Sequence, residues 1–285
     1  MKTGLVIINY NDMDNTINLI NEVSGYTSID KIVVVDNNSS KGRDMLDIKI
    51  NKLHVIKLDT NLGYSGAINV GCKYLIEEYG DINIIISNTD ISIPSNNVIK
   101  SLVKNIKNPS VGAIMPKVLE NGIYKYGWRL TNAKADLLLN IPLLNRLYRN
   151  KFLNYDMNHF LNPLPVVDTL YGCFFMIKSE VLKQIDYFDS SVFLYYEENI
   201  LARKLKKANL LTVVDTSVFV EHKHNATIGN NVSALNKYKI YKKSQLYYEK
   251  EYNNANRFEM FLFNLFYKVS LFFKNMKVKL KKEVN

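Results

Sequence analysis

The sequence has few cysteines: Cys72 and Cys173 are the two in 285 residues, and both have apolar neighbours. This scarcity excludes a disulfide-built scaffold and favours small core residues in a reducing compartment. Cysteine and histidine residues also lack the spacing of a zinc site. We therefore expect a fold built on a hydrophobic core, for which 47% hydrophobic residues provide enough material.

Long apolar runs are missing as well. No uncharged run reaches the ~18 residues that a membrane-spanning helix needs. Met1 to Gly4 leads directly into a strand-like run, without the pattern of a signal peptide. We therefore expect a cytoplasmic protein that is peripheral on the inner face of the cell membrane.

Acidic residues are outnumbered: 27 acidic side chains face 37 basic ones, and the formal net charge is +10. Such a balance favours acidic partners, namely nucleotides, nucleic acid or an anionic membrane surface. Half of this net charge, +5, lies after Asn256, and no nucleic-acid recognition motif occurs. We expect no nucleic-acid partner, and a basic nucleic-acid-binding protein is kept as a rival class.

Strand-like and helical segments alternate in the first 90 residues. β-Branched runs predict strands, and apolar residues at helical spacing predict helices. The strands are expected at Leu5–Ile8, Ile32–Val35, His54–Leu58 and Ile82–Ile86, and the helices at Asn15–Val23 and Ala67–Glu78. This order predicts an α/β fold with a Rossmann-like, largely parallel sheet flanked by helices.

Small or acidic polar residues follow each of these strands. Parallel strands bring such residues to one sheet edge, where α/β proteins bind nucleotides. Asp36 is suited to a base N–H or a ribose hydroxyl, and Gly63 and Gly66 to close approach of a phosphate. Their spacing fits neither a Walker loop nor a dinucleotide fingerprint. The expected nucleotide-binding residues are Asn9, Tyr10, Asn11, Asp36, Asn38, Gly63, Gly66, Asn69, Asn88 and Thr89.

Asp90 lies just beyond the apolar strand Ile82–Ile86, in the sequence Asn-Thr-Asp. A carboxylate at that place is suited to a hard divalent cation that also holds phosphate oxygens. The alternative is an ordinary turn, since all three residue types favour turns.

Four segments together resemble family 2 glycosyltransferases, most closely the rhamnosyltransferase-like bacterial branch. They are Ile-Ile-Asn-Tyr-Asn at 7–11, Val-Val-Asp-Asn-Asn-Ser-Ser at 34–40, Asn-Leu-Gly-Tyr-Ser-Gly-Ala-Ile-Asn-Val-Gly at 61–71, and Asn-Thr-Asp at 88–90. The resemblance implies the GT-A fold, a nucleotide-diphosphate sugar donor (dTDP or UDP), Mn2+ or Mg2+, and inversion at the anomeric carbon.

The resemblance extends to the second half of the chain. Tyr171, Gly172 and Cys173 match the acceptor-binding strand of the family, and Glu198 falls where the family has its general base, normally an aspartate. Glu197 is the second candidate for the base. Both acids are also suited to the amino end of a helix at 199–208, which is the structural alternative.

His222 falls on the histidine that often completes the family's metal site, together with Asp90. An imidazole, a carboxylate and phosphate oxygens suit Mn2+ or Mg2+. Besides Glu198, three positions depart from the family pattern: Ile200 stands where another acid is common, and His224 and Asn225 replace glycines.

Two regions fall outside this pattern. Residues 120–165 carry no clean period, which predicts either a substrate-covering segment or a loosely packed helical insert. From Phe258 onward, apolar residues follow helical spacing, and the sequence after Asn256 has seven basic residues against two acidic ones, which gives +5. Such a helix is typical of membrane-surface binding. It is also compatible with packing on the domain or on a second subunit, so a homodimer is conceivable.

We thus expect a GT-A glycosyltransferase domain at 1–228, with a nucleotide-sugar half (1–118) and an acceptor half (119–228), followed by a basic amphipathic helical tail at 229–285. The predicted function is inverting transfer, with rhamnose from dTDP-rhamnose as the best guess, to a lipid-linked glycan acceptor in cell-surface polysaccharide synthesis. The alternatives are a UDP-hexose-dependent transferase of the same fold, the nucleic-acid-binding class above, and a non-catalytic partner subunit.

Overall fold

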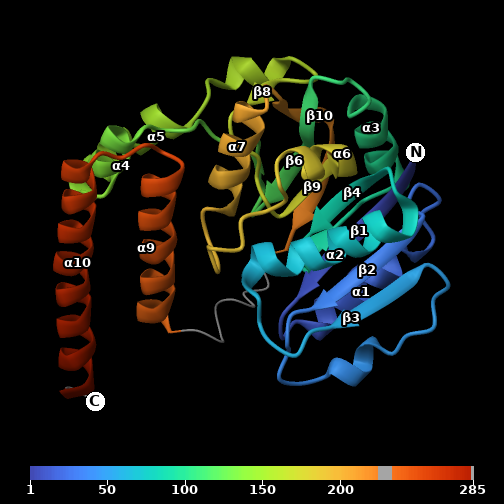
Figure 1. The fold of residues 1–285 in the computed structure, drawn as a ribbon, viewed down its shortest axis with the longest axis horizontal. Coiled ribbons are helices and arrows are strands. Elements are labelled where there is room, and N and C mark those ends of the chain that lie inside the picture. Colours follow the sequence, from blue (N-terminus) through green and yellow to red (C-terminus); the bar gives the residue numbers. More distant parts are fainter. Residues whose placement is uncertain (224–232, 284–285) are drawn as a thin grey trace.

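The computed structural model of the protein describes residues 1–223 and 233–283. In those residues one mixed sheet of ten strands has the order β3-β2-β1-β4-β9-β6-β10-β5, with β7 beside β6 and β8 beside β10. Helices pack against the sheet, and two long carboxyl-terminal helices stand to one side of it (Figure 1). The segment that carries His224 and Asn225, and the 228/229 domain boundary, lie outside the described residues.

The strands and helices follow the α/β order expected from the sequence. The strands are β1 (Lys2–Asn9), β2 (Lys31–Asp36), β3 (Leu53–Lys57), β4 (Ile82–Ser87), β5 (Ile91–Ser92), β6 (Val111–Glu120), β7 (Ile123–Lys125), β8 (Val166–Val167), β9 (Phe174–Lys178) and β10 (Leu211–His222). The helices are α1 (Met13–Ser24), α2 (Gly63–Tyr79), α3 (Asn96–Asn105), α4 (Ala133–Leu139), α5 (Pro142–Leu153), α6 (Ser179–Gln184), α7 (Glu197–Lys207), α9 (Ala234–Glu251) and α10 (Arg257–Glu283), with short 3₁₀ helices η1 (Arg43–Leu46) and η2 (Met157–Leu161).

Strand direction explains where the polar strand ends meet. β3, β2, β1 and β4 run parallel to one another. β9 runs antiparallel between β4 and β6, so β6 and its parallel neighbour β10 point the same way as β4. The carboxyl ends of β1, β2, β4, β6 and β10 therefore share one edge with the amino end of β9. We call this the site edge.

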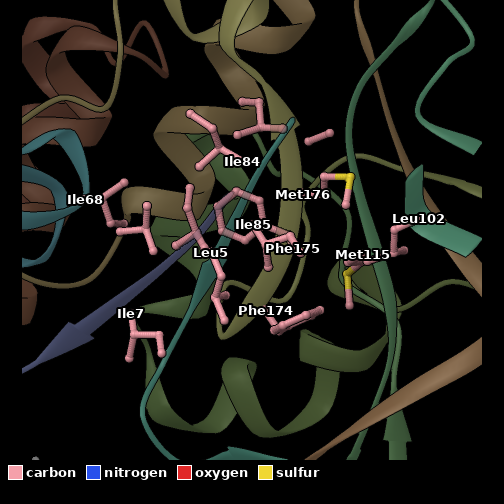
Figure 2. Close-up of a cluster of buried hydrophobic side chains, with 14 of the residues drawn as sticks. Leu5, Ile7, Ile68, Ile84, Ile85, Leu102, Met115, Phe174, Phe175 and Met176 are labelled. Carbon is pink, nitrogen blue, oxygen red and sulfur yellow. The ribbon is translucent and has the colours of Figure 1, made fainter. Parts of the chain in front are cut away.

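A continuous core lies beneath the site edge. All six residues of β4 are buried, as are seven of the eight in β1, because both strands are covered on both faces. Figure 2 shows side chains of β1, β4, β6 and β9 in one cluster, with Ile68 of α2 and Leu102 of α3 at its margin. Cys72 and Cys173 are buried and free.

The runs Leu211–Val214 and Val218–Val220, separated by three polar residues, predict two strands, but this prediction is wrong in detail because they form the single strand β10. Its register against β6 shifts between Asp215 and Phe219, so the polar residues between the two runs form a bulge within one strand. The buried Asp215 carboxylate holds that bulge by accepting hydrogen bonds from Ser101, Asn105 and Ser217.

The middle segment is a helical insert, one of its two predicted forms, because it contains α4, α5 and η2. The helix predicted from Phe258 onward is also present, as α10. It is preceded by α9, which packs on the sheet domain through Tyr248, fully buried with Ile200 and Val192. Within residues 1–223 and 233–283, no helix is both apolar and long enough to cross a bilayer.

Candidate active site

Asp90 and His222 come together at the site edge. β5 pairs antiparallel with the end of β10, which sets His222 opposite Ile91. The His222 Nε2 atom lies 3.2 Å from Asp90 Oδ1, and its Nδ1 atom lies 3.1 Å from Glu120 Oε1. Burial alone would lower the His222 pKa, but the hydrogen bonds and negative charges of Asp90 and Glu120 raise it.

This arrangement fits a divalent cation. One imidazole nitrogen faces a carboxylate, and the other is paired with a second carboxylate, as in metal sites where an outer carboxylate orients a histidine. Among the described residues, no group of three histidine, cysteine or acidic side chains is placed to hold a metal. Asp90 and His222 would therefore hold Mn2+ or Mg2+ only together with oxygens from a ligand such as a diphosphate.

Glu120 was missed by the sequence reasoning. It is the last residue of β6 and is 7% exposed. Its Oε2 atom accepts a hydrogen bond from the Tyr171 hydroxyl at 2.9 Å, so it joins the expected acceptor segment to His222. The strand-like run in the sequence is Val111–Met115, whereas β6 extends to Glu120, so the sequence did not place this acid at a strand end.

A strained turn presents the paired glutamates. Tyr195 and Tyr196 both have φ of 71°, a left-handed conformation uncommon for bulky residues, and α7 begins at the next residue, Glu197. Aromatic packing holds the turn, because the Tyr196 ring lies against Tyr241 and Tyr248 of α9. Strain of this kind is concentrated at functional sites.

Glu198 lies against the loop that precedes β9. A Cβ atom added to Gly172 would be 2.3 Å from Glu198 Oε1, so the carboxylate occupies space that only glycine leaves free. Burial raises the Glu198 pKa. Burial raises the pKa of Tyr64 and of Cys173 as well, and the negative charges of the nearby Glu198 and Asp90 raise both further.

Glu197 differs from Glu198 in its surroundings. It is 7% exposed, and its Oε2 atom is buried without a hydrogen-bond partner. Burial, followed by the charge of Glu198, raises the Glu197 pKa to about 8. Of the two acids, only Glu198 lines the adjacent cavity.

Ile200 replaces an acid for a visible reason. Its side chain is 1% exposed and packs with Val192 and with Tyr248 of α9. A carboxylate there would be buried among apolar groups, which is costly without a partner.

Asp36 is fully buried at the end of β2. One of its oxygens accepts from Asn9 Nδ2 at 2.7 Å, and the other from Arg43 Nε at 2.6 Å. Arg43 also donates to the Leu58 carbonyl oxygen. A nucleotide would reach Asp36 only if Arg43 moved, and no sequence pattern had indicated Arg43.

The glycine-bearing loop is closely packed. Gly63 has φ of 73°, and a Cβ there would lie 2.5 Å from the Phe193 carbonyl oxygen, so glycine is required. The amide groups of Leu62, Gly63 and Tyr64 at the start of α2 already donate to Asn37, Asn61 and Phe193. Gly66 is buried one turn into α2.

Five of the six remaining predicted nucleotide residues lie at the site edge, and one lies elsewhere. Asn88 accepts from the Tyr64 hydroxyl at 2.7 Å, and Thr89 donates to Asp12, both beside Asp90. Tyr10 is 41% exposed, and Asn11 and Asn38 adopt left-handed turns on the site edge. Asn69 points elsewhere, because its amide pairs with both backbone groups of Phe188, so we omit it from the proposed site.

A cavity of about 690 Å³ lies beside Glu198. Of the predicted site residues only Tyr171 and Glu198 line it. Most of its wall comes from the helical insert, including Trp128, Asn145 and Arg149, and from Tyr241 and Gln245 of α9. Aromatic and polar side chains together suit a sugar, which has both apolar ring faces and hydroxyl groups. The α9 contribution was not anticipated.

The fold and site define a GT-A protein of the α/β class with carboxyl-terminal helices. The chain belongs to glycosyl transferase family 2, whose sequence profile matches residues 5–186.

Individual relatives agree with this assignment. The chain is 28% identical over 207 residues to the low-salt glycan biosynthesis hexosyltransferase Agl10 of Haloferax volcanii, covering 73% of this chain and 62% of that protein, so it spans less than two thirds of that relative. The fold is similar to mannosyltransferase PcManGT from Pyrobaculum calidifontis in complex with GDP-Man and Mn2+ (TM-score 0.58, 12% identity, 90% of this chain and 65% of that one). It is also similar to S. aureus TarS residues 1–349 in complex with UDP-GlcNAc (TM-score 0.55, 16% identity, 90% and 74%).

Proposed function

We propose that the protein is an inverting glycosyltransferase that moves a hexosyl group from a nucleotide-diphosphate sugar to a hydroxyl of a glycan. The observation that carries the proposal is the position of Glu198. It lies at the wall of an aromatic cavity that Tyr171 also lines, and Tyr171 is hydrogen-bonded to Glu120, which pairs with His222 beside Asp90. A base that lines a cavity next to a metal and diphosphate site is the arrangement that glycosyl transfer requires.

In the proposed reaction, the Glu198 carboxylate takes the proton of an acceptor hydroxyl. The acceptor oxygen forms a bond to the anomeric carbon from the face opposite the diphosphate, and the bond between that carbon and the diphosphate oxygen breaks. Asp90 and His222 would hold Mn2+ or Mg2+, which supplies charge compensation for the departing diphosphate. Glu120 keeps His222 oriented, and Tyr171 links Glu120 to the acceptor side.

Two finer hypotheses differ in the identity of the sugar donor. The bacterial resemblance favours dTDP-rhamnose, whereas the Haloferax relative is named a hexosyltransferase, and solved relatives hold UDP-GlcNAc or GDP-Man. We favour a UDP- or dTDP-linked hexose and a glycan acceptor carried on a lipid, as in synthesis of capsule or O-antigen polysaccharide.

A thermal-shift panel tests the proposal. Wild-type protein is heated with dTDP-rhamnose, UDP-glucose, UDP-GlcNAc or GDP-mannose, each with and without Mn2+ or Mg2+. We expect one donor to raise Tm only with metal, since a ligand at ~100 times its Kd stabilises by ~2.7 kcal/mol. Absence of stabilisation by any nucleotide sugar with either metal would contradict the proposal.

A further inference from the structure

α10 carries a long apolar stripe on its outer side. The stripe consists of Phe258, Phe261, Leu265, Val269, Phe272 and Met276, each more than 40% exposed. These residues recur every three or four positions, so they lie on one helical face. At 1.5 Å per residue, the α10 stripe is about 27 Å long. Soluble proteins rarely expose so large an apolar surface without a partner.

The other side of α10 is packed. Phe263 is 2% exposed and forms a small core with Ala133 and Leu137 of α4. Tyr267 lies beside Tyr238 of α9. Because the helix is held on this side, the α10 stripe must point away from the protein, and Figure 1 shows α10 at the outer edge of the molecule.

α5 repeats the pattern at the cavity. Asn145, Arg149 and Leu153 line the cavity and are spaced four residues apart, so one face of α5 forms the cavity wall. Leu143 and Leu147 lie on the opposite face and are 67% and 62% exposed. We call these two leucines the α5 patch. α4 contacts both α5 and α10, so the helices that carry the patch and the α10 stripe are neighbours on the same side of the sheet (Figure 1).

Charge indicates what covers these surfaces. α5 contains Arg146, Arg149 and Lys151 and no acidic residue, and all three basic side chains are exposed. The sequence after Asn256 has seven basic and two acidic residues. Two copies of the chain docked through these faces would bring like charges together, whereas an anionic lipid surface would neutralise them. Apolar faces flanked by basic side chains are typical of helices that lie in a bilayer interface.

We propose that α5 and α10 form one docking surface for an anionic lipid bilayer, with the cavity at its border. α5 then has lipid on one face and the acceptor on the other. In this arrangement the phosphate of a lipid-carried glycan meets Arg149 while the sugar enters the cavity toward Glu198. The statement about the acceptor rests on the proposed function, whereas the statement about the bilayer does not.

Vesicle co-sedimentation of the full chain tests the surface. We expect binding to vesicles of phosphatidylglycerol and phosphatidylcholine, and little binding to phosphatidylcholine alone. Combined Phe258→Ser, Phe261→Ser and Phe272→Ser should lower the partition coefficient by about tenfold or more, since three aromatic side chains no longer enter the interface. Leu143→Ser with Leu147→Ser should lower it by a smaller factor. All five side chains are exposed, so the variants should keep their wild-type Tm.

Met45→Ser is the matched control, because Met45 is 47% exposed in η1, which lies far from α10 (Figure 1). Its binding should equal that of wild type. Equal binding to neutral and anionic vesicles, or undiminished binding of the α10 variant, would overturn the proposal. The proposal would also be overturned if the wild-type protein formed a dimer in solution without binding vesicles, and the α10 variant were monomeric. UDP or dTDP binding with Mn2+, measured separately, reports on the proposed function, so the two can fail independently.

Discussion

Gly172 and Glu198 share one space: a Cβ atom at position 172 would lie 2.3 Å from Glu198 Oε1 and 2.6 Å from its Cγ atom. The two residues come from different parts of the chain, the loop before β9 and the first turn of α7. The absent side chain of one residue therefore sets the position of the carboxylate of the other.

Gly172→Ala should displace the Glu198 carboxylate from the cavity wall. Because the obstructing atoms belong to a side chain that can rotate, we expect folding to survive and kcat to fall by about tenfold, in keeping with a misplaced base. Steady-state kinetics with donor binding measured alongside would check this. Gly25→Ala is the control, because no atom lies within 4 Å of a Cβ there. A variant with unchanged kcat would argue against Glu198 as the base.

Glu198→Gln should reduce kcat by about 100- to 10,000-fold, the range that a general base contributes. Glu197→Gln should have a much smaller effect, because that carboxyl does not line the cavity. Donor binding should persist in both variants, and single-turnover assays would separate binding from chemistry. The opposite order of effects would transfer the base role to Glu197.

The pH profile should carry the signature of a buried base. Only the carboxylate form of Glu198 accepts a proton, and burial raises its pKa above the ordinary 4.5. Activity should therefore increase with pH, and the rising limb of kcat/KM should lie above the usual carboxyl range. The residual rate of Glu198→Gln should lack that limb. A wild-type profile already flat at pH 5 would show that Glu198 ionises normally or does not act.

Asp90→Asn should abolish the stabilisation that nucleotide and metal provide together. The amide removes the charge that, with His222, would hold the cation, so the increase in Tm with UDP or dTDP and Mn2+ should disappear. Thermal melts with and without EDTA measure this effect. Asp81→Asn is the matched control, since its side chain is 74% exposed at the opposite sheet edge. Equal stabilisation of Asp90→Asn and wild type would place the metal elsewhere.

A buried acid pair should make stability depend on pH. Burial and the neighbouring Asp136 raise the Glu249 pKa to about 9, and Glu249 Oε1 has no partner unless a proton is present. The contribution of this proton to the free energy of unfolding is fully present below about pH 4.5. It is lost as the pH rises to about 9, by up to ~1.4 kcal/mol per pH unit.

Glu249→Gln cannot lose such a proton, so its Tm should match wild type near pH 4.5 and exceed it at pH 8. Glu251 is exposed, so the Tm of Glu251→Gln should not diverge from that of wild type as the pH rises. Parallel curves for Glu249→Gln and wild type across this range would indicate that Glu249 is ionised in the fold.

Much of the site could be predicted because it follows local rules. Asn88, Thr89 and Asp90 follow an apolar strand, and such strand ends gather at one edge of a parallel sheet. Asn69 belongs to the same sequence motif as Gly63 and Gly66, yet its amide pairs with the Phe188 backbone. Arg43, which pairs with Asp36, begins the short 3₁₀ helix η1, which no sequence pattern had indicated.

The sequence by itself determined the alternation of strands and helices, the polar strand ends and the amphipathic character of α10, because these depend on side chains near one another in the chain. Tertiary structure alone decided that β10 pairs parallel with β6, which brings Glu120 to His222. It also decided that Tyr241 of α9 completes the cavity beside Glu198. These contacts join residues that are 43 to 102 positions apart in the sequence. Strand order and helix docking bring them together, and no local sequence pattern encodes either.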